Sequence, residues 1–263
     1  MSAPAKFTRA LVRLPDDNFA DGLTASCLGP PNVAQARAQH ANYVWALEAC
    51  GLTVTRLEPD SRHPDGTFVE DTALVTTRGV LLTRPGAESR RGEVAAIAHA
   101  LEECFPAAET ETIHAPGTLD AGDVGEADGH FFIGISARTN VAGAQQLALW
   151  LAARGFTSTT VDIRALPGLL HLKSGFAHLG GRQLAAVGAL AAHPALHGWD
   201  VLLVPPGEDY AANCVRVNDV VLVPAGFPQT SALLRAAGLR VVELDVSEFK
   251  KMDGGLSCLS LRW

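Results

Sequence analysis

Five short polar clusters recur along the sequence, each directly before a segment with the apolar pattern of a β-strand. Together they supply thiols, one histidine, one amide and several carboxylates. A cysteine attacks as its thiolate, and a nearby imidazolium lowers the thiol pKa from its free value of about 8.5. Cys258 and His171 are therefore the candidate nucleophile and its partner. The clusters contain Glu70, Asp71, Asp120, Asp123, His171, Asn213 and Cys258.

The carboxylates in these clusters indicate what the site would bind. Acidic groups beside a thiol raise its pKa, so the cluster is chemically useful only if it meets a positive charge. A guanidinium is the natural match, because it donates two parallel hydrogen bonds to a carboxylate. Arg90 and Arg138 each precede a predicted helix, whose N-terminus favours anions, and could hold a carboxylate. A ligand with both groups is an arginine derivative.

A repeated unit of hairpin, helix and strand places these clusters. From Asp71 a hairpin turns at 78–79, and apolar residues follow at helical spacing over 93–104. The order recurs with a hairpin that turns at 127–129 into a strand over 130–135. This second unit continues with a helix over 141–154 and a strand over 157–163. The third has a hairpin that turns at 180–181 and a strand over 201–204. The fourth has a hairpin that turns at 218–219, a helix near 231–237 and a strand over 239–244.

The fifth unit is divided between the two ends of the chain. A strand over 258–263 ends the sequence, while a strand over 7–14, a helix over 32–49 and a strand over 52–57 follow its start. Joined, they predict one α/β domain over 1–263, a closed five-bladed α/β propeller in which no sheet edge stays open. An open doubly wound sheet would lack the hairpins. The five clusters would then meet at the axis of the ring.

The composition excludes several other classes of protein. The 263 residues are 48% hydrophobic and 19% charged, which is typical of a globular fold. A net charge of −7 disfavours nucleic acid as a partner. No apolar stretch approaches the roughly 20 residues of a membrane span, and no secretory signal is recognisable. Five cysteines without CxxC spacing fit no zinc ribbon. We expect a cytoplasmic protein without a membrane or nucleic-acid partner, either a monomer or a homodimer.

The sequence resembles the dimethylarginine dimethylaminohydrolases, a family within the pentein superfamily of guanidine-modifying enzymes that share a five-bladed α/β propeller. Seven matching segments follow one another in the family's order over almost the whole chain. They are DGLTAS at 21–26, PDGTFVED at 64–71, TRPGAESRRGE at 83–93, APGTLDAGD at 115–123, SARTN at 136–140, LHLKSG at 170–175 and DGGLSCLSLRW at 253–263.

The resemblance implies a role for each matched site residue. Cys258 would be the nucleophile, His171 the general acid and base, and Asp120 a carboxylate that faces the guanidinium. The implied reaction hydrolyses methylated arginine to citrulline and a methylamine through a covalent S-alkylthiouronium, with no metal or organic cofactor. The implied substrate-binding positions are Leu23 and Met252 through their carbonyls, Asp65, Glu70, Asp71, Arg90 and Arg138.

Other interpretations remain open at this point. Arginine deiminases and amidinotransferases use the same nucleophile, histidine and carboxylates, and a methylarginine-binding protein without turnover would keep the same pocket. Asp123 and Asn213 are as easily structural as functional. The irregular segment 15–31, rich in glycine, proline and aspartate, is long enough to be a lid over the site.

Overall fold

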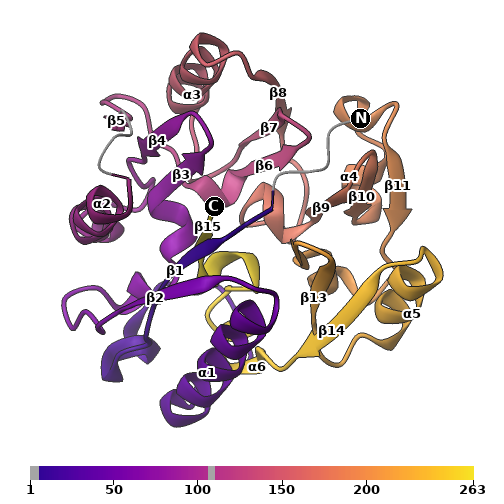
Figure 1. Ribbon diagram of the computed structural model, residues 1–263, viewed down its shortest axis with the longest axis horizontal. Coiled ribbons are helices and arrows are strands. Elements are labelled where there is room, and N and C mark those ends of the chain that lie inside the picture. The colour runs from indigo at the N-terminus through magenta and orange to yellow at the C-terminus, as the bar shows by residue number, and fades with distance from the viewer. Residues whose placement is uncertain (1–5, 106–109) are drawn as a thin grey trace.

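In the computed structural model, which describes residues 6–105 and 110–263, five three-stranded sheets surround a common axis (Figure 1). Each sheet, together with the helix that follows its first two strands, forms one blade. Within a blade the first two strands pair antiparallel and the third pairs parallel to the second. The α/β propeller predicted from the repeats is confirmed.

Four blades follow one another along the chain. Their hairpins are β3 (Ala73–Thr76) and β4 (Gly79–Leu82), β6 (Val124–Ala127) and β7 (His130–Ile135), β9 (Phe176–Gly180) and β10 (Gln183–Ala186), and β12 (Val215–Val217) and β13 (Val220–Pro224). The helix and third strand of each are α2 (Glu93–Cys104) and β5 (Thr110–Thr112), α3 (Val141–Ala153) and β8 (Thr157–Asp162), α4 (Gly188–Ala191) and β11 (Asp200–Leu203), and α5 (Pro228–Ala236) and β14 (Arg240–Leu244).

The fifth blade combines both ends of the chain, as predicted. β15 (Leu261–Arg262) pairs antiparallel with β1 (Arg9–Arg13), and β1 pairs parallel with β2 (Thr53–Leu57) after α1 (Val33–Ala49). The predicted strand over 258–263 is wrong in its first half, because a 3-10 turn occupies Ser257–Leu259. A one-turn helix, α6 (Ser247–Lys250), precedes it and was not predicted.

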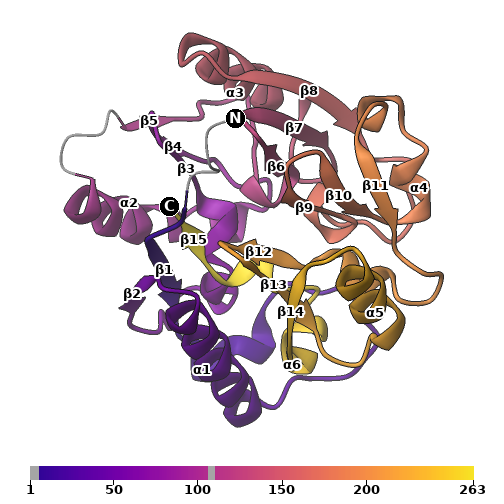
Figure 2. The ribbon, with the colours of Figure 1, turned by 45° about the vertical axis from the view of Figure 1, so that its right-hand side comes forward.

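The prediction that no sheet edge stays open is also wrong. Among the described residues the five sheets are separate, so each keeps two edge strands. The ring closes by side-chain packing between blades instead. Figure 2 shows the β6–β8 and β9–β11 sheets side by side, and the rings of Phe132 and Phe176 meet between them with centroids 5.2 Å apart.

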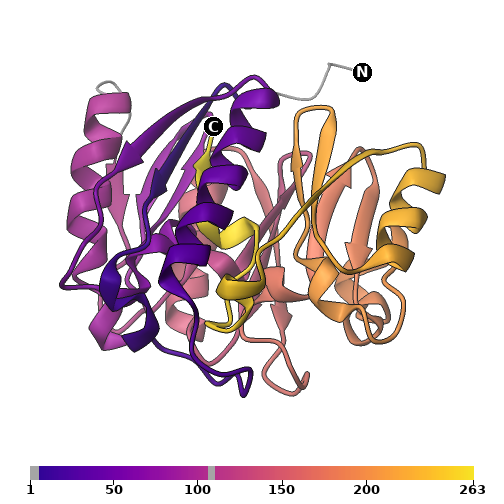
Figure 3. The ribbon, with the colours of Figure 1, turned by 90° about the horizontal axis from the view of Figure 1, so that it is seen from below.

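The longer helices form the outer wall of the ring (Figure 3). In α1 the buried side chains recur at helical spacing, with Ala36, His40, Tyr43 and Leu47 on one face. Asn32 caps this helix by accepting a hydrogen bond from the Gln35 N–H. No helix in residues 6–105 and 110–263 is long and apolar enough to span a bilayer.

A 3-10 turn precedes the first strand of every blade, at the positions of the five polar clusters. The turns are η3 (Val69–Thr72), η5 (Ala121–Asp123), η6 (Leu172–Ser174), η8 (Asp209–Ala212) and η9 (Ser257–Leu259). Neighbouring turns are in contact, and Asn213 after η8 bonds to Ser257 in η9, so the turns close a circle around the axis. The repeat therefore brings together residues that are far apart in sequence.

Candidate active site

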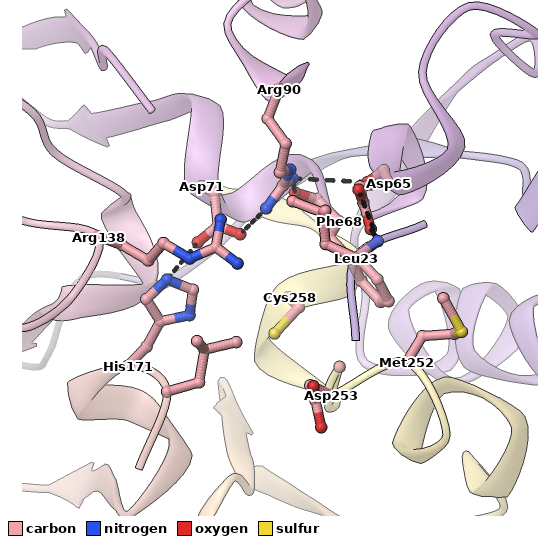
Figure 4. Close-up of a pocket in the computed structure, with 12 residues that line it drawn as sticks. Leu23, Asp65, Phe68, Asp71, Arg90, Arg138, His171, Met252, Asp253 and Cys258 are labelled. Atoms are coloured by element: carbon pink, nitrogen blue, oxygen red, sulfur yellow. Dashed lines mark hydrogen bonds and ion pairs between the residues drawn. The ribbon is translucent and has the colours of Figure 1, made fainter. Parts of the chain in front are cut away.

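A pocket opens where these turns meet the segment 15–31 (Figure 4). Eight of the ten predicted site residues line it: Leu23, Asp65, Asp71, Arg90, Arg138, His171, Met252 and Cys258. Asp120 and Glu70 lie outside its lining. The sequence prediction missed four lining residues, Phe68, Leu170, Asp253 and Gly254, although each is adjacent to or within a segment that carries the resemblance.

Two buried carboxylates hold the imidazole of His171. Its Nε2 lies 3.1 Å from Asp120 Oδ2 and 3.9 Å from Asp71 Oδ1. The other oxygen of Asp120 accepts a hydrogen bond from the Gly86 N–H, and Asp71 Oδ1 accepts one from the Gly122 N–H. A side chain at Gly122 would collide with both Asp71 and His171, so this close approach requires glycine. Asp120 therefore contacts the imidazole of His171 and is not part of the pocket lining, where the resemblance had implied that it faces the guanidinium.

The same carboxylates set the charge of His171. Burial alone would lower its pKa, but Asp71, Asp120 and Asp123 outweigh burial and raise the pKa to about 9. Burial would likewise raise the pKa of Asp71, but His171 and Arg90 hold it at about 2. At neutral pH the site thus contains an imidazolium beside ionised Asp71, and His171 can donate a proton.

We expect the free energy of unfolding to decrease in alkaline solution through His171. Its folded-state pKa of about 9 exceeds the ordinary 6.5, so this stabilisation is complete below pH 6.5 and is lost as the pH rises through 9. The loss amounts to roughly 3 kcal/mol. Urea unfolding across that range measures it, and His171→Gln should flatten the curve. An equally steep curve in the variant would assign the pH dependence to other groups.

Cys258 lies in η9 and lines the pocket together with His171 and Arg138 (Figure 4). Its side chain is half-buried. Burial, Glu70 and Asp71 raise the pKa of its thiol to about 12, against weaker opposing hydrogen bonds. Without a ligand, Cys258 is therefore a neutral thiol at physiological pH, and its activation needs a positive charge nearby.

The two arginines predicted to hold a carboxylate differ in their surroundings. Arg90 is buried and bonds to Asp71 Oδ2 at 2.6 Å, to both oxygens of Glu93 and to the Phe68 carbonyl. Arg138 is half-buried, and its guanidinium has no hydrogen bond or ion pair within the part of the chain that the structure describes. Of these two arginines, Arg138 is therefore the one whose guanidinium is free, among the described residues, to bind a ligand in the pocket. Arg90 mainly neutralises Asp71 and Glu93.

Two carboxylates hold the segment 15–31 over the pocket. Asp65 accepts hydrogen bonds from the Leu23 N–H at 3.1 and 3.2 Å, and burial raises the pKa of Asp65. Asp253 accepts one from the Ala25 N–H at 2.6 Å and one from the Thr24 hydroxyl at 3.1 Å. This arrangement agrees with the position expected of a lid, while its movement stays a prediction.

Glu70 and Asn213 join blades at the axis instead of lining the pocket. Glu70 accepts hydrogen bonds from Lys173 Nζ at 2.7 Å, Arg262 at 3.3 Å and the Ser257 hydroxyl at 2.7 Å. Asp123, fully buried, similarly accepts from the Ser136 hydroxyl and the Leu172 N–H. The contacts of Asp123 and Asn213 therefore favour a structural role over direct contact with a ligand. Glu70 acts on the site through its hydrogen bond to Ser257, next to Cys258.

One group in the site has the spacing of metal ligands. Donor atoms of Asp71, Asp120 and His171 lie within 4.8 Å of one another. The carboxylate oxygens already accept hydrogen bonds from Arg90, Gly86 and Gly122, and the imidazole nitrogen bonds to Asp120. The carboxylates of Asp71 and Asp120 therefore already have partners, and together they stabilise the protonated form of His171.

Comparison with known proteins connects this geometry to an enzyme. No family model matches the chain. A protein of Pseudomonas aeruginosa named N(G),N(G)-dimethylarginine dimethylaminohydrolase is 44% identical over 98% of this chain and 100% of its own length. A protein of Streptomyces coelicolor with the same name is 33% identical over 97% of this chain and 96% of its own.

Solved structures give the same result. A cysteine-to-serine mutant of the Pseudomonas aeruginosa enzyme, complexed with citrulline, superimposes with a TM-score of 0.95 at 43% identity and covers 98% of this chain and 100% of its own. The N-terminal domain of the cyanobacterial arginine dihydrolase ArgZ has a TM-score of 0.82 at 20% identity, with 98% and 97% covered, and shares the fold.

Proposed function

The chain belongs to the dimethylarginine dimethylaminohydrolase family, and we propose that Cys258, His171 and their neighbouring carboxylates perform its reaction. The protein is a hydrolase that converts methylated arginine to citrulline and a methylamine. The observation that best supports the residue roles is the convergence of Cys258, His171 and Asp71, from three different blades, on one pocket.

The pocket has complementary groups for each part of the substrate. Asp71 faces the guanidinium, and Arg138 binds the α-carboxylate, since its fork is free within the described residues. Leu23 and Met252 both line the pocket, and their carbonyls accept hydrogen bonds from the α-amino group in this proposal. Phe68 and Leu170 supply apolar walls against which N-methyl groups can pack.

The reaction proceeds in two steps. The thiolate of Cys258 attacks the guanidinium carbon, and protonated His171 donates its proton to the departing dimethylamine, which leaves an S-alkylthiouronium on the sulfur. Neutral His171 then takes a proton from a water molecule that attacks the same carbon. Citrulline departs and the thiolate is restored. Asp120 keeps Nε2 of the imidazole oriented through both steps.

The test is product analysis under steady-state conditions. Asymmetric dimethylarginine should yield citrulline and dimethylamine in equal amounts, and monomethylarginine should yield methylamine. Arginine is the control that separates the alternatives. Faster release of ammonia from arginine would favour a deiminase, transfer of the amidino group to an added amine would favour a transferase, and binding without any product would favour a receptor.

We expect the thiol of Cys258 to ionise when a cationic ligand binds. A guanidinium beside the sulfur offsets the effects of Glu70 and Asp71, which raise the thiol pKa. Thiolate absorbance, taken as the difference between wild type and Cys258→Ser, should appear at neutral pH on addition of an unreactive guanidinium ligand. Citrulline, which is uncharged at the same end, should leave it unchanged. Equal thiolate fractions with and without the cation would contradict this activation.

Replacing Arg138 with alanine should raise KM for dimethylarginine about 10- to 100-fold, because a charge-assisted contact with the α-carboxylate is worth about 1.5–3 kcal/mol. The midpoint of urea unfolding should hardly change, since the Arg138 guanidinium makes no hydrogen bond or ion pair with the described residues. Arg235→Ala is the matched control, because it removes an exposed ion pair between Arg235 on α5 and Glu243 on β14. A substrate without the carboxylate should be bound equally by Arg138→Ala and wild type; a persisting difference would remove Arg138 from this role.

Further properties complete the proposal. The five blades form one catalytic domain over 1–263, of which residues 1–5 and 106–109 lie outside the described part. The enzyme acts in the cytoplasm as a monomer or homodimer, without nucleic-acid or membrane partners, metal or organic cofactor. The net charge of −7 disfavours nucleic acid as a partner, and the side chains of Cys258 and His171 account for the proposed steps.

A further inference from the structure

The turn that carries Cys258 is fixed by the side chain of Asn213. Asn213 Oδ1 accepts a hydrogen bond from the Ser257 N–H at 3.0 Å, and its Nδ2 donates to the Ser257 hydroxyl at 3.0 Å and to the Lys173 carbonyl at 2.8 Å. A side chain at Gly255 would lie 2.4 Å from Asn213 Oδ1, so only glycine lets the amide approach. The oxygen of Ser257 therefore has a fixed position.

The bonding capacity of the Ser257 hydroxyl shows where its proton lies. A serine hydroxyl has one proton and two acceptor lone pairs. Asn213 donates to one lone pair, and the acceptor-only carboxylate of Glu70, with Oε2 at 2.7 Å, receives the proton. The remaining neighbour is Cys258, whose sulfur lies 3.9 Å away. The hydroxyl thus lies between the carboxylate of Glu70 and the sulfur of Cys258.

Glu70 does not depend on this proton for its charge balance. Lys173 Nζ lies 2.7 Å from its Oε1, and Arg262 lies 3.3 Å from the same oxygen. Both cations and the carboxylate are largely buried, so their interaction is little screened by solvent. Glu70 can therefore release the Ser257 hydroxyl and keep both cations as partners.

We propose that Ser257 is a positioning residue for the nucleophile, whose hydroxyl proton points to Glu70 while Cys258 is a thiol and turns to the sulfur when the thiolate forms. The proton remains on Ser257 throughout, and Asn213 holds the oxygen. The thiolate then gains a hydrogen-bond donor through rotation of the hydroxyl alone, without movement of the backbone. This inference rests on the proposed role of Cys258.

Several other charged groups surround the sulfur and contribute to its pH profile. Burial, Glu70 and Asp71 raise the pKa of Cys258, while the Ser257 hydroxyl acts in the opposite direction. The other titratable groups around the pocket and the turn are Asp65, Arg90, Arg138, His171, Lys173, Tyr210, Asp253 and Arg262. Since a serine-to-alanine change at 257 leaves all of them in place, the profile can isolate the hydroxyl.

The test measures the pH dependence of Cys258 alkylation by iodoacetamide, with the modified residue identified by peptide mapping. Removal of the hydroxyl in Ser257→Ala should move the profile to higher pH and slow alkylation about tenfold at a given pH below its midpoint. The value of kcat should fall by a similar factor with little change in KM. Ser257→Thr, which keeps a hydroxyl, should recover much of both rates if it folds.

Ser260→Ala is the matched control. Ser260 is buried two residues beyond the nucleophile and bonds to Tyr43 and Arg262, so its loss removes comparable packing without touching the sulfur. It should lose stability but keep the alkylation profile. An unchanged profile in Ser257→Ala would overturn the inference, even with lowered stability. Alkylation does not need turnover, so failure of Cys258 as nucleophile would appear separately, as activity retained in Cys258→Ser.

Discussion

Cys258→Ser is expected to abolish the release of citrulline and dimethylamine, with at least a 10³-fold loss in kcat. Loss of a covalent nucleophile removes the pathway itself, and effects of about 10⁴–10⁶ are typical. A serine hydroxyl in this site has no adjacent base to activate it, because His171 is already protonated at neutral pH. Steady-state assays of both products in parallel measure the effect.

Two comparisons make this result specific. Cys50→Ala removes a half-buried thiol at the end of α1 that does not line the pocket, and it should retain full activity. The Cys258→Ser protein should still bind citrulline and dimethylarginine, because Asp71, Arg138 and the apolar walls are untouched. Measurable turnover in this variant, above the level of a blank, would show that another group attacks the guanidinium.

The repeat made the order of elements predictable. Hairpin turns at 78–79 and 127–129 separate short apolar runs, and the helix over 93–104 and the strand over 130–135 coincide with α2 and β7. These elements are local, since alternation and helical spacing record which face is buried. The pattern predicts no helix in the third blade, because α4 is a single turn, Gly188–Ala191, which is too short to show a period.

The turns at the axis could not be predicted from local patterns. The sequence of residues 257–263 is apolar and alternating like a strand, but Ser257 and Cys258 curl into a 3-10 turn. The bonds that hold this turn come from Asn213, 44 residues earlier, and Glu70, 187 residues earlier. Such long-range hydrogen bonds leave no signal in a window of a few residues.

The sequence predicted which residues lie in or near the pocket more accurately than it predicted what each residue does there. The resemblance placed Glu70 and Arg90 among the substrate-binding residues, yet Glu70 lies outside the pocket lining and Arg90 is bonded to two carboxylates. A charged residue type is visible in a sequence, but the partners that consume its hydrogen bonds are not. Arg90 differs from Arg138 in that its N–H groups already donate hydrogen bonds to Asp71, Glu93 and Phe68.

Arg90→Met should therefore act mainly on stability, with a loss of about 3–5 kcal/mol in the free energy of unfolding. The change leaves the buried carboxylates of Asp71 and Glu93 without their shared cation. Activity should fall too, because Asp71 is then displaced or protonated. Urea unfolding at neutral pH measures the loss. An unchanged midpoint with only a raised KM would instead place Arg90 on the α-carboxylate of the substrate.

The pH dependence identifies the cause of that loss. In the wild type, Arg90 helps to hold the pKa of Asp71 at about 2, so its stabilisation persists until strongly acid pH. Without Arg90, burial dominates and both carboxylates take up protons at higher pH. The stability difference between variant and wild type should therefore narrow as the pH falls, and Arg90→Met/Glu93→Leu, which buries one fewer charge, should recover part of it at neutral pH. A constant difference at every pH would indicate lost packing around the Arg90 side chain rather than uncompensated charge.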